Sequence, residues 1–230
     1  MRPLVVARPE PGNRDSANAA RALGLEVVAE PLFEIASSPW NVTNSDPYDG
    51  IFITSANALI HAGPALQPLL SRPLFAVGSA SAAAGRAAGF TTIHTGHGNG
   101  QDLADLAARQ GAQHLLHLAG DPHKAIQHPD LQFDIKIVYQ TLERPPSPQL
   151  IEALSKACVV LLHSPRMARR IADLVPVRAQ IDLVAISAAT AEAAGPGWKS
   201  CQWPDHPSAE AMLACAAPLC RDDARGTTPA

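Results

Sequence analysis

The chain has 230 residues, of which 47% are hydrophobic and 17% are charged, and its formal net charge is -3 at pH 7. This composition is typical of a folded protein, and the spread of its charges gives no basic stripe of the kind that binds nucleic acid. No apolar run approaches the roughly 20 residues that a membrane span needs, and the N-terminus begins with a strand pattern in place of a signal peptide. We therefore expect a cytoplasmic protein that has neither a membrane nor a nucleic acid as its partner.

The cysteines and histidines form no metal-binding pattern. The four cysteines, Cys158, Cys201, Cys215 and Cys220, include no CxxC pair and lie mostly in apolar or helical patterns, where a free thiol acts as a small hydrophobe. The nine histidines have no cysteine or carboxylate at ligand spacing and include no HExxH motif. We expect reduced structural thiols and no metal site.

The chain opens with strand and helix patterns in alternation. Residues 3–7 (PLVVA) predict a strand, residues 15–23 predict a helix that ends at Gly24, and residues 25–35 predict a second strand. Residues 36–47 are rich in Ser, Asn and Pro and lack periodicity, which predicts a linker near a domain boundary.

Residues 48–89 contain two strand-to-helix turns of the same kind. The apolar runs at 51–53 and 74–77 end in Thr54-Ser55-Ala56-Asn57 and in Gly78-Ser79-Ala80-Ser81, and Ala/Leu-rich sequence of helical type follows each run. Ser, Thr, Asn and Gly cap helices and tolerate tight turns. The backbone N–H groups at such turns, with the helix dipole behind them, attract anions.

A glycine-rich turn follows the next predicted strand. Residues 90–94 predict that strand, and residues 96–100 (GHGNG) lead into a helix over 101–109. The glycines are compatible with a nucleotide-dependent transferase. However, the spacing lacks the third glycine of the dinucleotide-binding fingerprint, and no acidic residue ends a following strand, which favours a flexible structural turn.

The next unit again has the order strand, helix, strand. Residues 114–118 predict a strand that ends in Ala119-Gly120-Asp121, a short helix follows through Ile126, and residues 133–140 predict another strand. A Pro-rich segment, residues 143–148, separates this unit from the rest of the chain.

The second half of the chain repeats the turns of residues 48–89. Two apolar runs, at 159–162 and 183–186, end in small polar residues like those of the first copy, so that Ser164 corresponds to Ser55. Two copies imply two similar halves. If the two sets of turns face one another, they line a cleft with helix starts that bind anions.

Strands that alternate with helices predict an α/β fold with parallel sheets that helices cover on both faces. Two groupings fit the repeat: tandem halves, or a middle domain inserted through two chain crossings. The Pro-containing linkers favour the second grouping, because two adjacent extended crossings make a hinge. It gives a discontinuous domain at 1–35 plus 144–220, an inserted domain at 37–140, and a disordered tail at 221–230.

Six segments stand out in the chain: ITSANAL, AVGSASAAAGRAAG, VYQT, LLHSPRMA, AISAATAEA and PSAEAML. Each alone is a generic strand, turn and helix, but their order and spacing resemble the uroporphyrinogen-III synthase family from residue 3 to about residue 217. The resemblance implies two similar parallel-sheet α/β domains joined by a two-stranded connector. It also places the first and last parts of the chain in one domain, which supports the discontinuous grouping.

By this resemblance, the substrate is the linear tetrapyrrole hydroxymethylbilane. The enzyme would be a cyclising hydro-lyase of tetrapyrrole, porphyrin and heme biosynthesis that removes the hydroxyl of the substrate as water and closes the ring. The terminal (D) pyrrole ring is inverted, and uroporphyrinogen III is formed without a metal or an organic cofactor. A substrate rich in carboxylates suits a cleft lined with helix starts. We also expect a monomer that receives the bilane by hand-over from the upstream bilane-forming enzyme.

Tyr139, in the VYQT segment, is the candidate catalytic residue. The resemblance implies that it assists departure of the hydroxyl group by hydrogen bonding or as a general acid, since a phenol is protonated at neutral pH and can donate. The other interpretation is an aromatic residue that packs at a strand end. Because the protein also has to hold the bilane in the geometry of the inverted path, loss of Tyr139 should slow the reaction without abolishing it.

The candidate substrate-binding residues come from the strand-to-helix turns. They are Ser55, Gly78, Ser81, Gly120, Ser164 and Thr190. By resemblance, Ser81 and Thr190 orient substrate carboxylates through a hydroxyl or an adjacent N–H, although Ser and Thr at such positions also cap helices. Two positions depart from the family pattern: Ser187 replaces a glycine, and Ala119 replaces an arginine, which removes a partner for a carboxylate.

A protein of another class would share this architecture. It is a hinged two-domain binding protein or sensor, which closes on an anionic small molecule without reacting with it. Tyr139 distinguishes the two hypotheses. A binding protein should lose affinity when Tyr139 is replaced by Phe, whereas a synthase should keep binding its substrate and turn it over more slowly.

Overall fold

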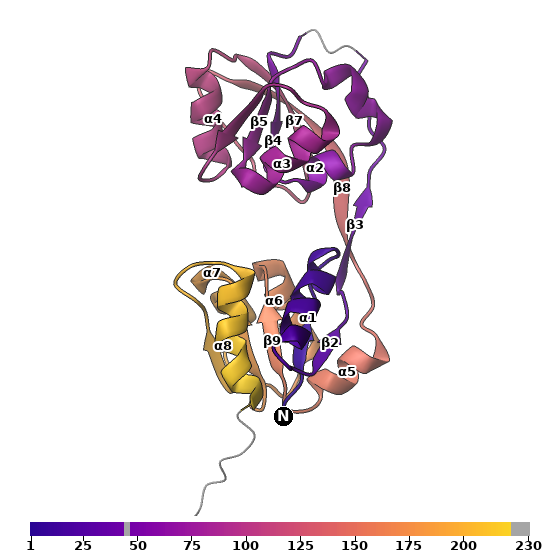
Figure 1. Ribbon diagram of the computed structural model, residues 1–230, viewed down its shortest axis with the longest axis vertical. Helices are drawn as coiled ribbons and strands as arrows, with labels where there is room; N and C mark the ends of the chain where they lie inside the picture. The colour runs from indigo at the N-terminus through magenta and orange to yellow at the C-terminus, as the bar shows by residue number, and fades with distance from the viewer. Residues whose placement is uncertain (44–46, 222–230) are drawn as a thin grey trace, which may run out of the picture. The chain divides into compact units, whose positions relative to one another are not determined.

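The computed structural model describes residues 1–43 and 47–221. Contacts between residues divide the chain into two units, Met1–Glu34 with Glu143–Ala230, and Ile35–Leu142. They are termed here the discontinuous unit and the inserted unit, and each is built on a mainly parallel sheet (Figure 1). The predicted disordered tail, residues 221–230, is wrong at Arg221, which ends a helix, and its residues 222–230 lie outside the described residues, as do residues 44–46 of the predicted linker.

The discontinuous unit has a five-stranded sheet with the order β11-β10-β9-β1-β2, in which all neighbours are parallel. Its strands are β1 (Leu4–Val6), β2 (Val27–Ala29), β9 (Val159–Leu162), β10 (Asp182–Ala185) and β11 (Ser200–Gln202). Its helices are α1 (Gly12–Ala22), α5 (Pro148–Leu154), α6 (Pro165–Leu174), α7 (Ala188–Ala194) and α8 (Ala209–Arg221).

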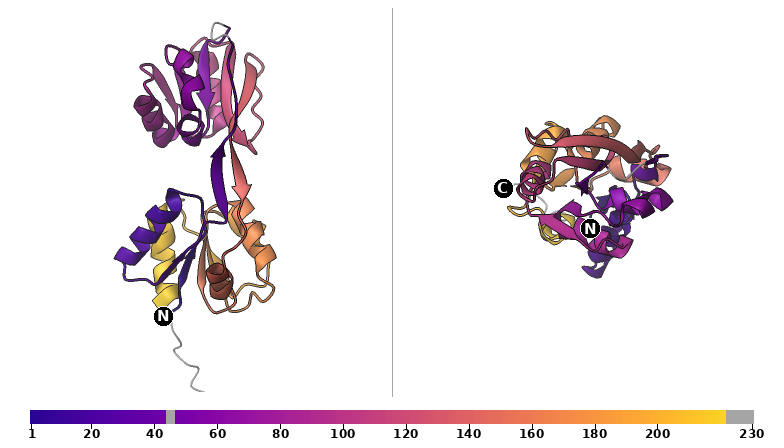
Figure 2. Two further views of the ribbon diagram at one scale, coloured as in Figure 1. Left: turned by 90° about the vertical axis from the view of Figure 1, so that its right-hand side faces the viewer. Right: turned by 90° about the horizontal axis from the view of Figure 1, so that it is seen from above.

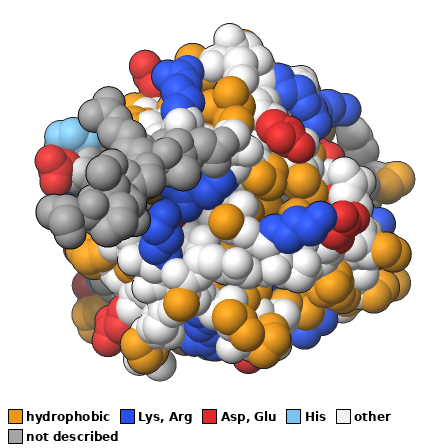
Figure 3. Space-filling model, turned by 90° about the horizontal axis from the view of Figure 1, so that it is seen from below, with side chains coloured by type: hydrophobic (Ala, Val, Ile, Leu, Met, Phe, Trp, Pro, Cys, Tyr) orange, Lys and Arg blue, Asp and Glu red, His pale blue; other side chains and the backbone are white. Residues whose placement is uncertain are grey.

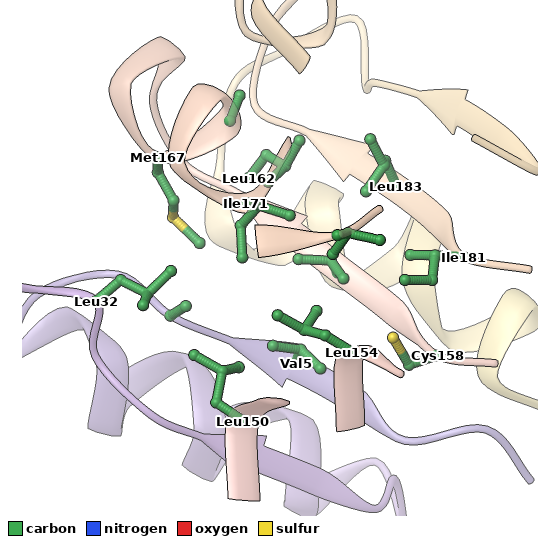
Figure 4. Packing of buried hydrophobic residues seen from close by; sticks show 14 of the residues in the cluster. Val5, Leu32, Leu150, Leu154, Cys158, Leu162, Met167, Ile171, Ile181 and Leu183 are labelled. Atoms are coloured by element: carbon green, nitrogen blue, oxygen red, sulfur yellow. The ribbon is translucent and has the colours of Figure 1, made fainter. Parts of the chain in front are cut away.

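Both faces of this sheet are apolar, because the strands alternate between two buried clusters. Leu4 and Val6 of β1 pack with α1 and α8, which lie side by side on one face (Figure 2). Val5 points to the other face and joins a second cluster with α5, α6 and α7 (Figure 4). Strands that are buried on both faces read as continuous apolar runs, which explains why the sequence PLVVA lacks alternation.

The inserted unit has a six-stranded sheet with the order β3-β8-β7-β4-β5-β6. Its strands are β3 (Phe33–Ser37), β4 (Gly50–Ile53), β5 (Leu74–Val77), β6 (Ile93–Gly96), β7 (His114–Asp121) and β8 (Gln132–Glu143). Its helices are α2 (Asn57–Ile60), the 3-10 helix η1 (Gly63–Leu69), α3 (Gly78–Ala88) and α4 (Gly100–Arg109). Ile51 and Ile53 pack with α2, η1 and α3 on one face, and Phe52 packs with α4 on the other.

The division between the two units falls inside β3 and inside β8. These strands are neighbours, and two backbone hydrogen bonds flank the division: Ser38 N–H to Val138 C=O at 2.9 Å, and Arg144 N–H to Leu32 C=O at 2.9 Å. The later residue of one strand pairs with the earlier residue of the other, so β3 and β8 are antiparallel. This confirms the predicted two-stranded connector.

The two parallel sheets have the same topology. The order β2-β1-β9-β10-β11 in one unit corresponds to β8-β7-β4-β5-β6 in the other, which confirms the internal repeat. In each sheet the direction of chain progress reverses at one place, between β1 and β9 and between β7 and β4. At such a reversal the following helices lie on opposite faces, which leaves a crevice at the carboxyl ends of the two strands.

The predicted short helix through Ile126 is wrong. Residues 122–131, between β7 and β8, form a loop that contains one isolated bridge, His128 to Leu131. Pro122 and Pro129 bracket the segment, and only Ala125 and Ile126 are apolar between them. The stretch between the prolines is too short and too polar to bury a helical face.

Two other local predictions needed correction. The helix expected after Ser55 is split into α2 and η1, because Gly63 adopts a φ of +64° and Pro64 follows it. The strand expected at 90–94 begins only at Ile93. Phe90 instead belongs to the end of α3, where its N–H donates to the carbonyl of Gly85 at 3.1 Å beyond the left-handed Gly89.

Part of the predicted linker is packed. The Trp40 indole N–H donates to the carbonyl of Ala62 at 2.7 Å, and Trp40 and Val42 pack against the buried cluster of α2, η1 and α3. The segment after β3 is therefore part of the inserted unit.

The four cysteines are free, as the sequence predicted. Burial raises the pKa of Cys158 to about 12 and that of Cys220 to about 11, so both thiols stay protonated at neutral pH. Among the described residues, no helix has the length and apolar character needed to cross a membrane. On the face shown in Figure 3, basic, acidic and hydrophobic side chains are interspersed.

Candidate functional site

A cavity of about 540 Å³ lies at the carboxyl ends of β4, β7 and β8 in the inserted unit. Its lining residues are Thr54, Asn99, Gly100, Gln101, Gly120, Pro122, His123, Lys124, Ala125, Ile126 and Tyr139. They come from the turn after β4, the start of α4, the end of β7 with the loop that follows it, and β8. This is the crevice between β4 and β7, the position where open parallel sheets bind ligands.

Tyr139 and Gly120 face each other in this cavity. They are register partners in β8 and β7, beside an irregularity of the pairing between Ala119 and Gly120. A Cβ atom at Gly120 would lie 2.6 Å from the Tyr139 hydroxyl oxygen and closer still to the ring. The phenol therefore lies directly across the backbone of Gly120, and the lack of a side chain there makes room for it.

Because the ring of Tyr139 packs against Gly120, we expect Gly120 to determine the position of the phenol. We expect Gly120→Ala to push the phenol out of place and to lower kcat on the order of 10²-fold, as small displacements of a reacting group do. The measurement is kcat and KM with the substrate that the resemblance implies, together with the thermal unfolding midpoint, which separates displacement of the ring from loss of the fold.

The control is a double-mutant cycle with Tyr139→Phe. If Gly120 acts by placing the hydroxyl of Tyr139, Gly120→Ala should cost much less when combined with Tyr139→Phe than it does in the wild type. Equal costs in both backgrounds would contradict this role.

The hydroxyl of Tyr139 is available to a ligand. Among the described residues, none forms a hydrogen bond with it. The imidazole of His61 lies beside the phenol, with 6.0 Å between the ring centroids, and its Nδ1 is 3.1 Å from the Ser37 hydroxyl. Burial lowers the pKa of His61, which favours the neutral ring at physiological pH. No pattern in the sequence pointed to His61.

The GHGNG turn is a helix cap. The Asn99 side chain accepts hydrogen bonds from the N–H groups of Gln101 and Asp102 at 2.7 and 3.3 Å, and the Asp102 carboxylate accepts one from the Asn99 N–H at 2.9 Å. A Cβ atom at Gly98 would overlap that carboxylate, and one at Gly100 would lie 2.6 Å from Ile126 Cδ1. The glycines thus serve a capping box and close packing, which supports the structural interpretation of this turn.

The other predicted residues of the inserted unit lie outside the cavity lining. The Ser55 hydroxyl, at the end of β4, accepts a hydrogen bond from the Asn57 N–H at 3.3 Å. Gly78 begins α3 with a φ of +75°, and Ser81 is buried in the first turn of that helix. All three lie at the carboxyl ends of β4 and β5, and their contact with substrate stays a prediction.

Ser164 and Thr190, in the discontinuous unit, occupy helix starts. Ser164 caps α6 by accepting from the Met167 N–H at 3.2 Å. Thr190 is fully buried in α7, and its hydroxyl lies 3.2 Å from that of Ser187, the N-cap residue. Ser187, which replaces the glycine of the family pattern, therefore caps α7, and the capping interpretation accounts for its side chain.

Arg8 and His163 were missed by the sequence analysis. They follow β1 and β9, the neighbouring strands at the crevice of the discontinuous unit, and His163 corresponds to Thr54 in the repeat. Burial lowers the pKa of Arg8, and burial together with the charge of Arg8 lowers that of His163 to about 3. His163 is therefore neutral at physiological pH. The internal repeat carries the signal for this pair, because aligning its two copies places His163 at the same strand end as Thr54.

Within the described ranges, no three His, Cys, Asp or Glu side chains are grouped so that they could hold a metal ion.

Comparisons with known proteins agree with this architecture. The chain matches the family model described as "Uroporphyrinogen-III synthase HemD" over residues 15–214. A uroporphyrinogen-III synthetase from Helicobacter pylori has a similar structure, with 18% identity, a TM-score of 0.66, and coverage of 95% of this chain and 100% of that chain. A mutant uroporphyrinogen III synthase from Thermus thermophilus is similar with 14% identity, a TM-score of 0.56, and coverage of 97% and 100%. A search of curated proteins found no match.

Proposed function

Since the chain belongs to the uroporphyrinogen-III synthase family, it is an enzyme of heme biosynthesis, and we propose that it dehydrates and cyclises hydroxymethylbilane to uroporphyrinogen III. The terminal (D) ring is inverted during closure, and the reaction class is a cyclising hydro-lyase. The observation that carries this proposal is the phenol of Tyr139, which lines the cavity at the strand ends without a hydrogen-bond partner among the described residues.

Tyr139 would act at the first step. Its O–H gives its proton to the hydroxyl oxygen of the substrate as the carbon–oxygen bond breaks, so that the hydroxyl group leaves as water. The phenolate regains a proton from the one that the substrate releases when the ring closes. Gly120 allows the phenol to take this position, because a side chain there would overlap the ring. General acid assistance of this kind contributes about 10²- to 10⁴-fold to a rate.

The turns at the strand ends would bind the substrate. We propose that Ser55, Gly78, Ser81, Gly120, Ser164 and Thr190 contact its carboxylates through hydroxyl or backbone N–H groups. Each exposed contact of an anion with a helix start is worth only about 0.3–1 kcal/mol, so tight binding needs several at once. The choice of isomer then depends on the shape in which the protein holds the bilane, more than on one side chain.

The test is incubation with freshly prepared hydroxymethylbilane, followed by oxidation and chromatography of the porphyrin isomers. We expect the type III isomer to be formed faster than the bilane closes without protein. Only the type I isomer, at the rate of a sample without protein, would overturn the proposed function.

Three further expectations accompany the proposal. The protein acts as a monomer, it receives the bilane by hand-over from the upstream bilane-forming enzyme, and it works in the cytoplasm. These stay predictions from the sequence and the resemblance.

A further inference from the structure

The loop between β7 and β8 brings a cation to the cavity. Among the described residues that line it, Lys124 is the one Lys or Arg side chain, and none is Asp or Glu. The other polar groups there come from Thr54, Asn99, Gln101, His123 and Tyr139. The one formally charged side chain among these lining residues is therefore a cation, which favours binding of an anionic group beside the phenol.

Contacts on both sides of Lys124 fix the loop that carries it. His123 packs edge-on against the buried His117, with 5.9 Å between the ring centroids. Ile126 packs against the cluster that α4 forms with the sheet, and its Cδ1 lies 2.6 Å from the position that a Cβ atom at Gly100 would take. Further along, His128 Nε2 lies 3.5 Å from an oxygen of Asp105. The backbone at Lys124 thus lies between two residues whose side chains contact the sheet and α4.

No described group of the protein neutralises this cation. Lys124 is exposed, and within the described ranges its ammonium group has neither an ion pair nor a hydrogen bond. His117, the contact of His123, is neutral at physiological pH, because burial, with a contribution from His123, lowers its pKa to about 4. Lys124 therefore lines the cavity with its charge unpaired among the described residues.

We propose that Lys124, held by the anchored loop at residues 122–128, forms a carboxylate-binding subsite beside Tyr139 for one side-chain carboxylate of the linear tetrapyrrole. This inference rests on the proposed function, since it names a contact of the same site. Lys124 would supply the positive charge for the carboxylate. Ala119 cannot supply it, because it is buried near the end of β7 and carries no charge. Contact with the carboxylate positions the adjoining pyrrole ring near the phenol.

A binding role predicts a change in KM and little change in kcat. We expect Lys124→Ala to raise KM for hydroxymethylbilane about 5- to 10-fold, as loss of a hydrogen bond between charged groups does at a partly solvated site. Lys124→Glu should raise KM further by repelling the carboxylate, and Lys124→Arg should stay close to the wild type. High salt should raise KM of the wild type by a larger factor than KM of the Ala variant.

The matched control is Arg109→Glu. Arg109 is an exposed cation at the last residue of α4, whereas Gly100 at the first residue of that helix lines the cavity. This variant makes the same change in net charge in the same unit, so an unchanged KM in it excludes a general effect of charge. Lys124→Glu with KM within about twofold of the wild type, or with a fall in kcat alone, would overturn the subsite, since a lost charged contact costs more than that.

A second readout separates this inference from the proposed function. Binding of uroporphyrin III, the oxidised form of the product, is titrated by its fluorescence with wild type, Lys124→Ala, Lys124→Glu and Arg109→Glu. Weaker binding by the two Lys124 variants alone supports the subsite, and equal binding by all four proteins overturns it. If the wild type fails to form the type III isomer, the proposed function falls, and this titration still decides the role of Lys124.

Discussion

Replacing Tyr139 by Phe should lower kcat about 10²- to 10⁴-fold and leave KM for hydroxymethylbilane nearly unchanged. The variant loses only the hydroxyl, while the ring still fills its place across Gly120. Because no described residue bonds to that hydroxyl, the substitution leaves no buried group unsatisfied, and the thermal unfolding midpoint should stay the same. Steady-state kinetics and chromatography of the porphyrin isomers make the measurement.

The matched control for Tyr139 is Tyr48→Phe. Tyr48 lies in the same unit, and its hydroxyl bonds to Asp134 at 2.9 Å, away from the cavity. This variant should keep its activity and lose about 1 kcal/mol of stability. A binding protein without catalysis predicts another result for Tyr139→Phe, a loss of ligand affinity. Unchanged kcat in that variant would remove Tyr139 from the chemistry.

Replacing Asp182 by Ala should destabilise the discontinuous unit by about 3–5 kcal/mol, the usual cost of removing one partner of a buried ion pair. Asp182 and Arg2 are 2% and 7% exposed and form an ion pair with each other. The Ser200 hydroxyl donates to the same carboxylate at 2.6 Å, and Lys199 Nζ lies 3.5 Å from it. The variant would leave the guanidinium of Arg2 buried without its carboxylate. Urea unfolding followed by circular dichroism measures the change.

The effect of Asp182 should depend on pH in a defined direction. Burial alone raises the pKa of Asp182, but the hydrogen bonds from Ser200 and Arg2 and the charges of Arg2 and Lys199 outweigh it, so the pKa is below its ordinary value. A carboxyl group with a lowered pKa in the folded state stabilises the fold above its unfolded pKa, about 4, and the stabilisation is lost as pH falls through the folded value. The difference between wild type and variant should therefore be constant at neutral pH and shrink in acid.

Asp205→Ala is the control for Asp182. Asp205 is exposed in the same unit, and its substitution should change the free energy of unfolding by about 0.5 kcal/mol or less. If Asp182→Ala has an effect as small as this control, the ion pair with Arg2 does not stabilise the unit.

The strands of both sheets could be anticipated from the sequence because they carry a strong local signal. The runs at 51–53, 74–77 and 159–162 are short and apolar, and polar turn residues end them sharply. Such runs form β4, β5 and β9, which are buried on both faces. Local sequence therefore determines these elements, and the repeat indicates that they are arranged alike in the two units.

The candidate site was less accessible from the sequence. The resemblance pointed to Tyr139, but the sequence did not show that Gly120 makes room for its ring. That role depends on the pairing of β7 with β8 and on the irregularity beside Ala119. Lys124 lies in a segment that was predicted to be helical, and that prediction gave no reason to place its side chain at the cavity. Contacts between residues distant in the chain decide both cases, and spacing along one segment does not report them.

The place of β9 in its sheet has a consequence for synthesis on the ribosome. β9 lies between β1 and β10, while β1 is made at the very start of the chain. All strands of the inserted unit have been translated once Glu143 is added, so that sheet can be completed first. Until Val159–Leu162 emerges, the apolar edge of β1 has no neighbour on that side, and the growing chain has to keep this edge from pairing with other strands.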